Sequence, residues 1–133
     1  METKSNAATP KRPTGNRPLS APLLVTDLPA ALRQLRQEPT WASNDRNAIT
    51  LFKNKTLSMV LTALHVGASL KTHIAPGIIS VQVLEGCLAF GSAGRSVELA
   101  AGQVLVLQAG IPHSVTALEE AAFLLTVVAT GNS

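Results

Sequence analysis

The segment LAAGQVLVLQAGIPHSV, residues 99–115, shows how this chain alternates strands and turns. Its centre, QVLVLQ at 103–108, is an apolar run rich in β-branched residues, and Gly102 and Gly110 stand on either side of it. Glycines in such positions mark tight turns. Pro112 has a fixed φ that holds extended backbone just before His113. The segment therefore predicts a strand, a turn and a second strand that begins with a firmly held histidine.

The same alternation extends outward over most of the chain. Eight short apolar runs, separated by breaks that are rich in glycine or polar residues, lie at 48–53, 56–66, 78–84, 87–91, 95–100, 103–108, 113–118 and 121–129. Short strands at this spacing predict an all-β antiparallel sandwich or barrel. The run 56–66 is apolar on both faces, so we expect its outer face to be covered by a helix or by a second subunit. This pattern favours a homodimer.

One helix is expected before the strands. In the segment 26–39, Asp27 can accept hydrogen bonds at the helix N-terminus, Pro29 is compatible with the first turn, and Pro39 ends the run. Its apolar stripe is formed by Leu28, Ala31, Leu32 and Leu35. We interpret this helix as scaffold that packs on the barrel.

Residues 1–22 differ in composition from the rest. They contain four basic side chains, one acidic side chain and four prolines, whereas residues 23–133 contain seven basic and seven acidic side chains. We expect 1–22 to be a disordered leader and 23–133 to form one domain. The neutral domain, with only four aromatic residues, argues against nucleic-acid binding.

The location of the protein is predicted from cysteine usage and hydropathy. Cys87 is the single cysteine, so no internal disulfide can form. The sequence shows neither a membrane span nor the apolar core of a signal peptide. We expect a cytoplasmic protein without membrane partners, in which Cys87 serves packing.

Two histidine motifs identify a family resemblance. The first runs from Gly67 through His73 to Gly86, and the second from Gly102 to His113. In order, spacing and strand context, these motifs resemble those of the cupin superfamily, also called RmlC-like jelly rolls. The resemblance covers about residues 48–129 and implies a small barrel of two packed sheets, a double-stranded β-helix, that is often dimeric.

The resemblance also implies a site. In metal-binding cupins the first motif supplies two histidines and a glutamate, and the second supplies one histidine. In this chain the corresponding residues are His73, Ala75, Ile79 and His113, so two of the four ligands are missing. We expect His73 and His113 to face each other across the barrel, with His65 as a possible third ligand. A divalent metal (zinc, iron or nickel) is possible at such a reduced site, and no cofactor is certain.

Three functions remain open. The chain looks closest to short, stand-alone bacterial cupins of unassigned activity. The favoured hypothesis is a small-molecule binding or sensing barrel whose ligand is oriented by His73 and His113. The first alternative is a metal-dependent oxygenase or isomerase with two or three histidine ligands, and the second is a dimeric interaction module without a ligand. A purely structural role for the histidines, each neutral and hydrogen-bonded, also stays open.

Overall fold

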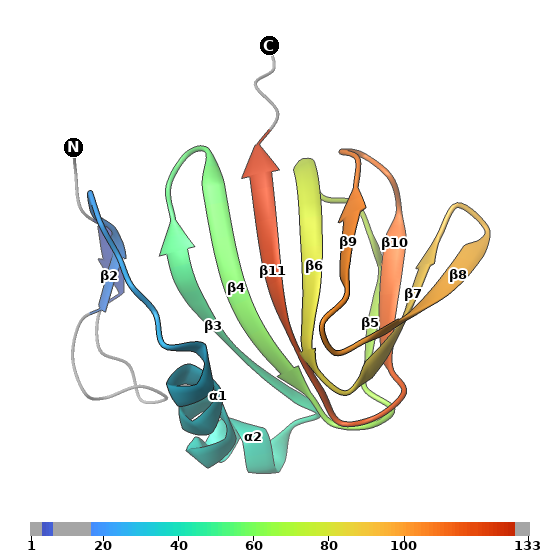
Figure 1. Cartoon of the computed structure of the whole chain (residues 1–133), viewed down its shortest axis with the longest axis horizontal. Coiled ribbons are helices and arrows are strands. Elements are labelled where there is room, and N and C mark those ends of the chain that lie inside the picture. The colour runs from blue at the N-terminus through green and yellow to red at the C-terminus, as the bar shows by residue number, and fades with distance from the viewer. Residues whose placement is uncertain (1–3, 7–16, 130–133) are drawn as a thin grey trace.

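Two antiparallel sheets face each other in the computed structural model, which describes residues 4–6 and 17–129 (Figure 1). The five-stranded sheet has the order β3 (Arg46–Lys53), β4 (Leu57–Leu64), β11 (Ala121–Ala129), β6 (Gly77–Glu85), β9 (Val104–Leu107). The four-stranded sheet has the order β5 (Ser69–His73), β10 (His113–Ala117), β7 (Cys87–Ser92), β8 (Arg95–Ala100). The predicted all-β barrel of two sheets is confirmed.

All eight predicted runs form strands, and within the two facing sheets one further strand, β5, was missed. β5 contains only one inward apolar residue, the half-buried Leu70, and its other residues are exposed. The sequence therefore carries no alternation that distinguishes it from a loop. The strand exists because it pairs with β10. The predicted run 56–66 is also shorter, since β4 ends at Leu64 and leaves His65 in the following turn.

The predicted helix is α1 (Leu28–Gln37), and its start is held by the predicted cap. The Asp27 carboxylate accepts a hydrogen bond of 3.0 Å from the backbone N–H of Ala30. The helix ends before Pro39, as expected, but this proline also begins a second helix, α2 (Pro39–Ser43). Proline suits a first helical turn because its missing N–H has no partner there in any case.

The outer face of the five-stranded sheet is covered by α1 over part of β3, β4 and β11. Leu32 and Leu35 are buried in a cluster with residues of β3, β4 and β11, namely Ile49, Leu61, Ala63 and Ala122. The double-sided apolar character of the run 56–66 therefore has an explanation within the chain. The helix covers one face and the barrel interior the other.

Part of the predicted leader forms regular structure. β1 (Lys4–Asn6) pairs antiparallel with β2 (Arg17–Ser20), and Leu19 and Ser20 are buried. This differs from the expected disorder over 1–22, because Leu19 offers an apolar side chain that can be buried. The rest of that prediction falls on residues 1–3 and 7–16, which lie outside the described residues.

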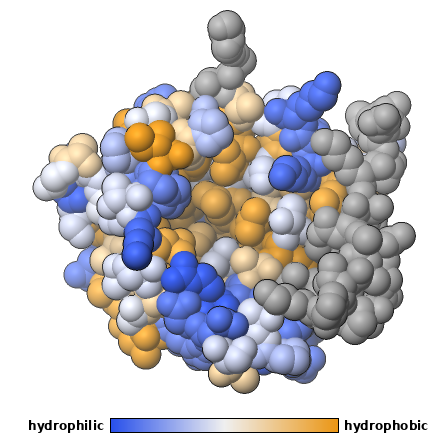
Figure 2. Space-filling model, turned by 180° about the vertical axis from the view of Figure 1, so that it is seen from behind, coloured by the Kyte–Doolittle hydropathy of each residue, from blue (hydrophilic) through white to orange (hydrophobic). Residues whose placement is uncertain are grey.

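The barrel interior is mostly aliphatic, and Phe90 and Phe123 are the aromatic residues of its buried cluster. Its buried cluster combines inward residues of both sheets, among them Leu64, Val81, Val83, Leu88, Phe90, Leu99, Val115 and Phe123. Seen from behind, hydrophobic residues gather in the middle of this face and again along its left edge, and hydrophilic residues lie mainly below the middle and at the upper right (Figure 2). In the described part of the chain, no helix is long and apolar enough to cross a membrane.

One side of the barrel is left open. β8 and β9 are consecutive in the chain and joined by a short turn, where the Gly102 N–H donates to the Val83 carbonyl at 2.9 Å. β8 pairs only with β7, and β9 pairs only with β6. From their shared turn the two strands diverge in a V (Figure 1). We call the gap between them the seam.

Candidate functional site

Four side chains form a row across the inner face of the four-stranded sheet. In the register of the sheet, His73 lies opposite His113, His113 lies opposite Ser92, and Ser92 lies opposite Arg95. Directly paired residues of antiparallel strands project to the same face. We call His73, His113, Ser92 and Arg95 the polar row. The end of the barrel that carries it, where β5 and β9 end and β6 and β10 begin, is the pocket end.

The two motif histidines are in contact, but not across the barrel. They belong to neighbouring strands of one sheet, and their ring centroids are 4.2 Å apart in an edge-to-face arrangement. The expectation that they face each other from opposite sides is therefore wrong. Its cause is the missed strand β5, which pairs directly with β10 and brings His73 beside His113.

Both imidazoles are oriented by the backbone in the same way. Nδ1 of His73 lies 2.9 Å from the Lys71 carbonyl, and Nδ1 of His113 lies 2.9 Å from the Ile111 carbonyl. A carbonyl oxygen can only accept, so each Nδ1 carries the proton. In the neutral form of each ring, Nε2 therefore keeps its lone pair for a ligand. His113 is buried and its ring stacks on Phe90 at 5.6 Å, whereas His73 is exposed.

A pocket of about 280 Å³ lies beside this row, at the seam. Its residues come from the hairpin of β7 and β8, from β9 and from the loop before β10, and they are Phe90, Ser92, Ala93, Arg95, Val97, Leu105, Val106, Leu107 and Ile111. Phe90 lines the pocket and also stacks on His113. The histidine pair and the pocket are therefore parts of one site.

The opposite wall of the pocket end is apolar. On the five-stranded sheet, Ile79 lies opposite Leu107 on one side and Val127 on the other, and all three belong to the barrel core. We call Leu107, Ile79 and Val127 the apolar row. Ile79, which stands where metal-binding cupins have glutamate, is 2% exposed. Ala75, at the position of the second histidine, is half-buried against the same core.

The residues present do not complete a metal centre. Among residues 4–6 and 17–129, no group of three or more histidine, cysteine, aspartate or glutamate side chains is placed to hold a metal ion. Catalytic zinc takes three protein ligands, and non-haem Fe(II) takes two histidines and a carboxylate. Here the donors of the pocket end are two imidazoles on one sheet, and the facing sheet offers only hydrocarbon.

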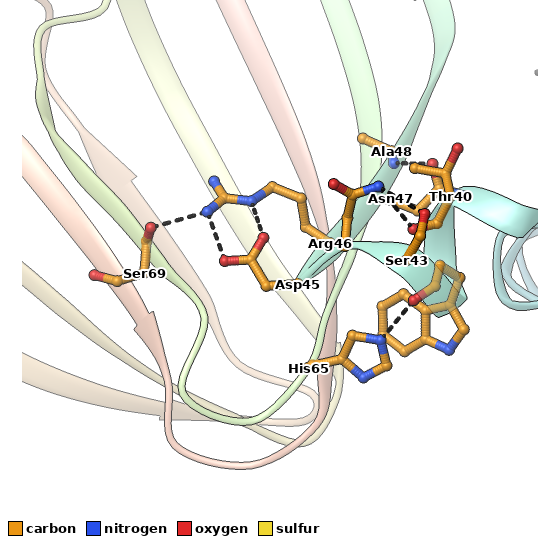
Figure 3. Close-up of polar contacts among 10 residues, drawn as sticks. Thr40, Ser43, Asp45, Arg46, Asn47, Ala48, His65 and Ser69 are labelled. Carbon is orange, nitrogen blue, oxygen red and sulfur yellow. Dashed lines mark hydrogen bonds and ion pairs between the residues drawn. The ribbon is translucent and has the colours of Figure 1, made fainter.

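His65, the possible third ligand, lies at the other end of the barrel. It follows β4 beside the turn in which the Gly67 N–H donates to the Ala117 carbonyl, at the opposite end of β10 from His113. Its Nε2 is 2.8 Å from the Trp41 carbonyl, and its ring stacks on the Trp41 ring at 3.5 Å (Figure 3). His65 joins α2 to the barrel, and the structure does not bring it to the other two histidines.

The thiol of Cys87 is poorly suited to act as a nucleophile. Burial raises the pKa of the Cys87 thiol, and the negative charges of Glu98 and Glu119 raise it further. A raised pKa leaves less of the reactive thiolate at neutral pH. This agrees with the packing role expected from the sequence.

Ser92 and Arg95 were not singled out from the sequence. The feature of the sequence that could have identified them is the hairpin tip GSAG (91–94). Its two turn residues, Ala93 and Gly94, both adopt positive φ, of 52° and 74°. A two-residue hairpin turn of this kind places the residues on either side of it opposite each other. The runs 87–91 and 95–100 on either side of this tip were correctly predicted as strands. What the sequence did not reveal is that this pair continues the row that begins at His73.

Comparisons with known proteins rest on structure. No family model and no curated protein matches this sequence. A conserved protein of unknown function from Streptococcus pyogenes superposes with a TM-score of 0.68 and 26% identity, over 86% of this chain and 94% of that one. A cupin 2 conserved barrel domain protein from Leptotrichia buccalis gives 0.61 and 32%, over 62% of this chain and 40% of that one.

A third similar structure is an enzyme. Salicylate 1,2-dioxygenase from Pseudaminobacter salicylatoxidans superposes with a TM-score of 0.57 and 22% identity, over 62% of this chain and 26% of that one. With the paired sheets, these likenesses show that the chain has the RmlC-like cupin fold. The similar structures include both proteins of unknown function and dioxygenases, so the comparisons define the fold and not an activity.

Proposed function

We propose that this cupin is a small-molecule binding or sensing protein whose ligand occupies the pocket at the seam. The observation that carries the proposal is the pocket itself, which shares Phe90 with the histidine pair. Its volume of about 280 Å³ lies just below the usual range of ligand sites, roughly 300–1,000 Å³. The ligand is therefore small.

The polar row supports orientation of the ligand from one side. Because both Nδ1 atoms are engaged with carbonyls, the neutral imidazoles present Nε2 as hydrogen-bond acceptors. Ligand sites typically combine an apolar lining with a few placed polar groups that fix orientation. The pocket and its neighbouring row have this composition.

The metal-dependent alternative draws on the same two histidines and on the dioxygenase among the similar structures. Two imidazoles anchored through Nδ1 are a usual arrangement for metal ligands. A third protein donor is missing in the described part of the chain, however. Titration of metal-free protein with Zn²⁺, Fe²⁺ and Ni²⁺ distinguishes the two proposals. Stoichiometric binding that disappears in His73→Ala would favour the enzyme.

A ligand-free interaction module is the third possibility, and the pocket argues against it. The homodimer remains a prediction. The apolar outer face of the run 56–66 no longer requires a second subunit, because α1 already covers the outer face of β4. The exposed Val104 and Val106 on the edge strand β9 offer an apolar surface for a second copy. Sedimentation velocity across a range of concentrations measures the oligomeric state.

The binding proposal is tested by blocking the pocket. Val97 lines it, while Val104 is exposed on β9 and does not. Neutral probes of suitable size are benzyl alcohol and hexanol. We expect amide chemical shifts of Phe90, Ser92 and Leu107 to move on titration of either probe into the native protein. Val97→Trp should abolish these shifts, whereas Val104→Trp, as the matched control, should retain them. Shifts that survive Val97→Trp, or no saturable shifts, would contradict the proposal.

A further inference from the structure

Arg95 gives the pocket a charge that the two cupin motifs do not account for. It stands at the end of the polar row and is the one charged side chain among the residues that line the pocket. Neighbouring strands lie about 4.8 Å apart, so two strand spacings put its Cα about 10 Å from that of His113. A guanidinium on a flexible side chain can reach the space between them.

The described chain supplies no carboxylate to neutralise Arg95. The ion pairs found among residues 4–6 and 17–129 use Arg36 and Arg46, not Arg95. Glu98 is on the same strand, but at an odd spacing of three residues, which turns it to the opposite face of the sheet. The pocket therefore presents a positive charge without an acidic partner.

Arg95 is also the member of the polar row that can donate hydrogen bonds to a ligand. Ser92 donates its hydroxyl to the Pro112 carbonyl at 3.0 Å. The protonated nitrogens of His73 and His113 face the Lys71 and Ile111 carbonyls. In their neutral forms, these rings can only accept from a ligand. An anionic group in the pocket consequently has one side-chain donor in this row, the Arg95 guanidinium.

The rest of the lining limits what the anion can be attached to. Phe90, Val97, Leu105, Leu107 and Ile111 surround the pocket with hydrocarbon. A single guanidinium matches a single carboxylate with two parallel hydrogen bonds. A phosphate dianion or a diacid would retain charge that this lining cannot satisfy. Size, lining and charge together describe a small apolar molecule with one carboxylate.

We propose that the ligand class of this pocket is a small apolar monocarboxylate, held by Arg95 through its carboxylate and by the hydrocarbon lining through its body. This assignment rests on the proposed binding function and specifies it. It makes Arg95 the residue that determines specificity for the charge of the ligand, while the lining determines the affinity for its body.

Matched pairs of probes test the assignment. Benzoate is compared with benzyl alcohol, and hexanoate with hexanol, by titration calorimetry and amide shifts. We expect each acid to bind about tenfold or more tightly than its alcohol, the magnitude of a charge-assisted hydrogen bond. Arg95→Gln should lower the affinity for each acid to about that for its alcohol. Lys55→Gln makes the same change of charge on an exposed turn and should have no effect.

The outcomes separate the two proposals. If acids and alcohols bind equally, or if Arg95→Gln leaves the preference intact, the monocarboxylate assignment is overturned and the binding function stands. If neither acids nor alcohols bind, both proposals fail. Phenyl phosphate serves as a third head group, and tighter binding of it than of benzoate would also overturn the assignment. Arg95→Lys, which keeps the charge but loses the fork of donors, should retain part of the preference.

Discussion

The two sheets contribute opposite chemistry to the pocket end of the barrel. The four-stranded sheet carries the polar row, which contains all the imidazole and guanidinium groups of the site. The five-stranded sheet carries the apolar row of Leu107, Ile79 and Val127. A metal ion coordinated by protein alone needs donors that converge from several directions, and here they come from one wall. The comparison therefore favours a ligand with one polar edge and one apolar face.

The two walls also differ in their contribution to stability. Ile79 is fully buried in the barrel core, whereas His73 is exposed and makes its hydrogen bond to its own strand. Burial of an aliphatic side chain contributes about 1.5–3 kcal/mol, while an exposed polar group contributes little. We infer that the apolar row stabilises the fold and that the polar row is available for function.

The largest expected effect comes from placing a carboxylate on the apolar row. Ile79→Glu puts an ionisable group into hydrocarbon, and we expect the free energy of unfolding to fall by about 3 kcal/mol or more at pH 7. Burial raises the pKa of such a carboxyl. The loss should therefore be smallest below the unfolded-state pKa of about 4.3 and grow as the pH rises above it. Urea denaturation at several pH values, each against native protein, measures this.

The control for that variant is Ser80→Glu, on the outward face of the same strand. Equal stability of the two variants at pH 7 would contradict the assigned burial of Ile79.

Ile79→Glu also tests the difference between the two sheets in metal binding. With a carboxylate on the facing sheet, the donor set becomes two histidines and a carboxylate. Added Zn²⁺ should then raise the melting temperature of Ile79→Glu and leave that of Ser80→Glu unchanged.

The second-largest expected effect on stability comes from substituting alanine for one residue of each row. Ile79→Ala removes a fully buried side chain, for which a loss of about 2–5 kcal/mol is usual. His73→Ala removes an exposed ring, and we expect less than about 1 kcal/mol. Thermal and chemical denaturation of the two variants provide the comparison. Similar losses would show that the polar row is part of the structural core.

The smallest expected effect is a gain at the hairpin that carries Ser92 and Arg95. Ala93 has a φ of 52°, a left-handed conformation that costs a residue with a Cβ about 1–2 kcal/mol. Ala93→Gly relieves this strain at some cost in chain entropy, so we expect a gain of up to about 1 kcal/mol. Ala89→Gly, in the middle of β7, should instead lose stability. A loss in both variants would contradict the assigned turn.

The fold was predictable where neighbouring residues in the sequence form a recognisable pattern. The apolar runs identified eight strands, Asp27 identified the start of α1, and the two motifs identified His73 and His113. β5 could not be found in this way, because it is polar and gains its structure from pairing with β10. The same missing strand caused the error in the relative placement of the two histidines.

The site was less predictable because it depends on register between distant segments. Arg95 reaches the polar row only through the successive pairings of β10 with β7 and of β7 with β8. His65 shows the opposite case, in which residues close in sequence lie far apart in the structure. It is eight residues from His73 in sequence, but β5 runs from one end of the barrel to the other and separates them. Neither relation can be derived from spacing along the chain.

The seam has a consequence for the kinetics of binding. Because β8 and β9 diverge and pair with different neighbours, the pocket opens sideways along the gap between two sheet edges. A small molecule can reach it from solvent without displacement of a strand or loop of the described chain. Association then needs no conformational step, so its observed rate rises linearly with ligand concentration. Differences in affinity among related ligands are accordingly expressed in how long each one stays bound.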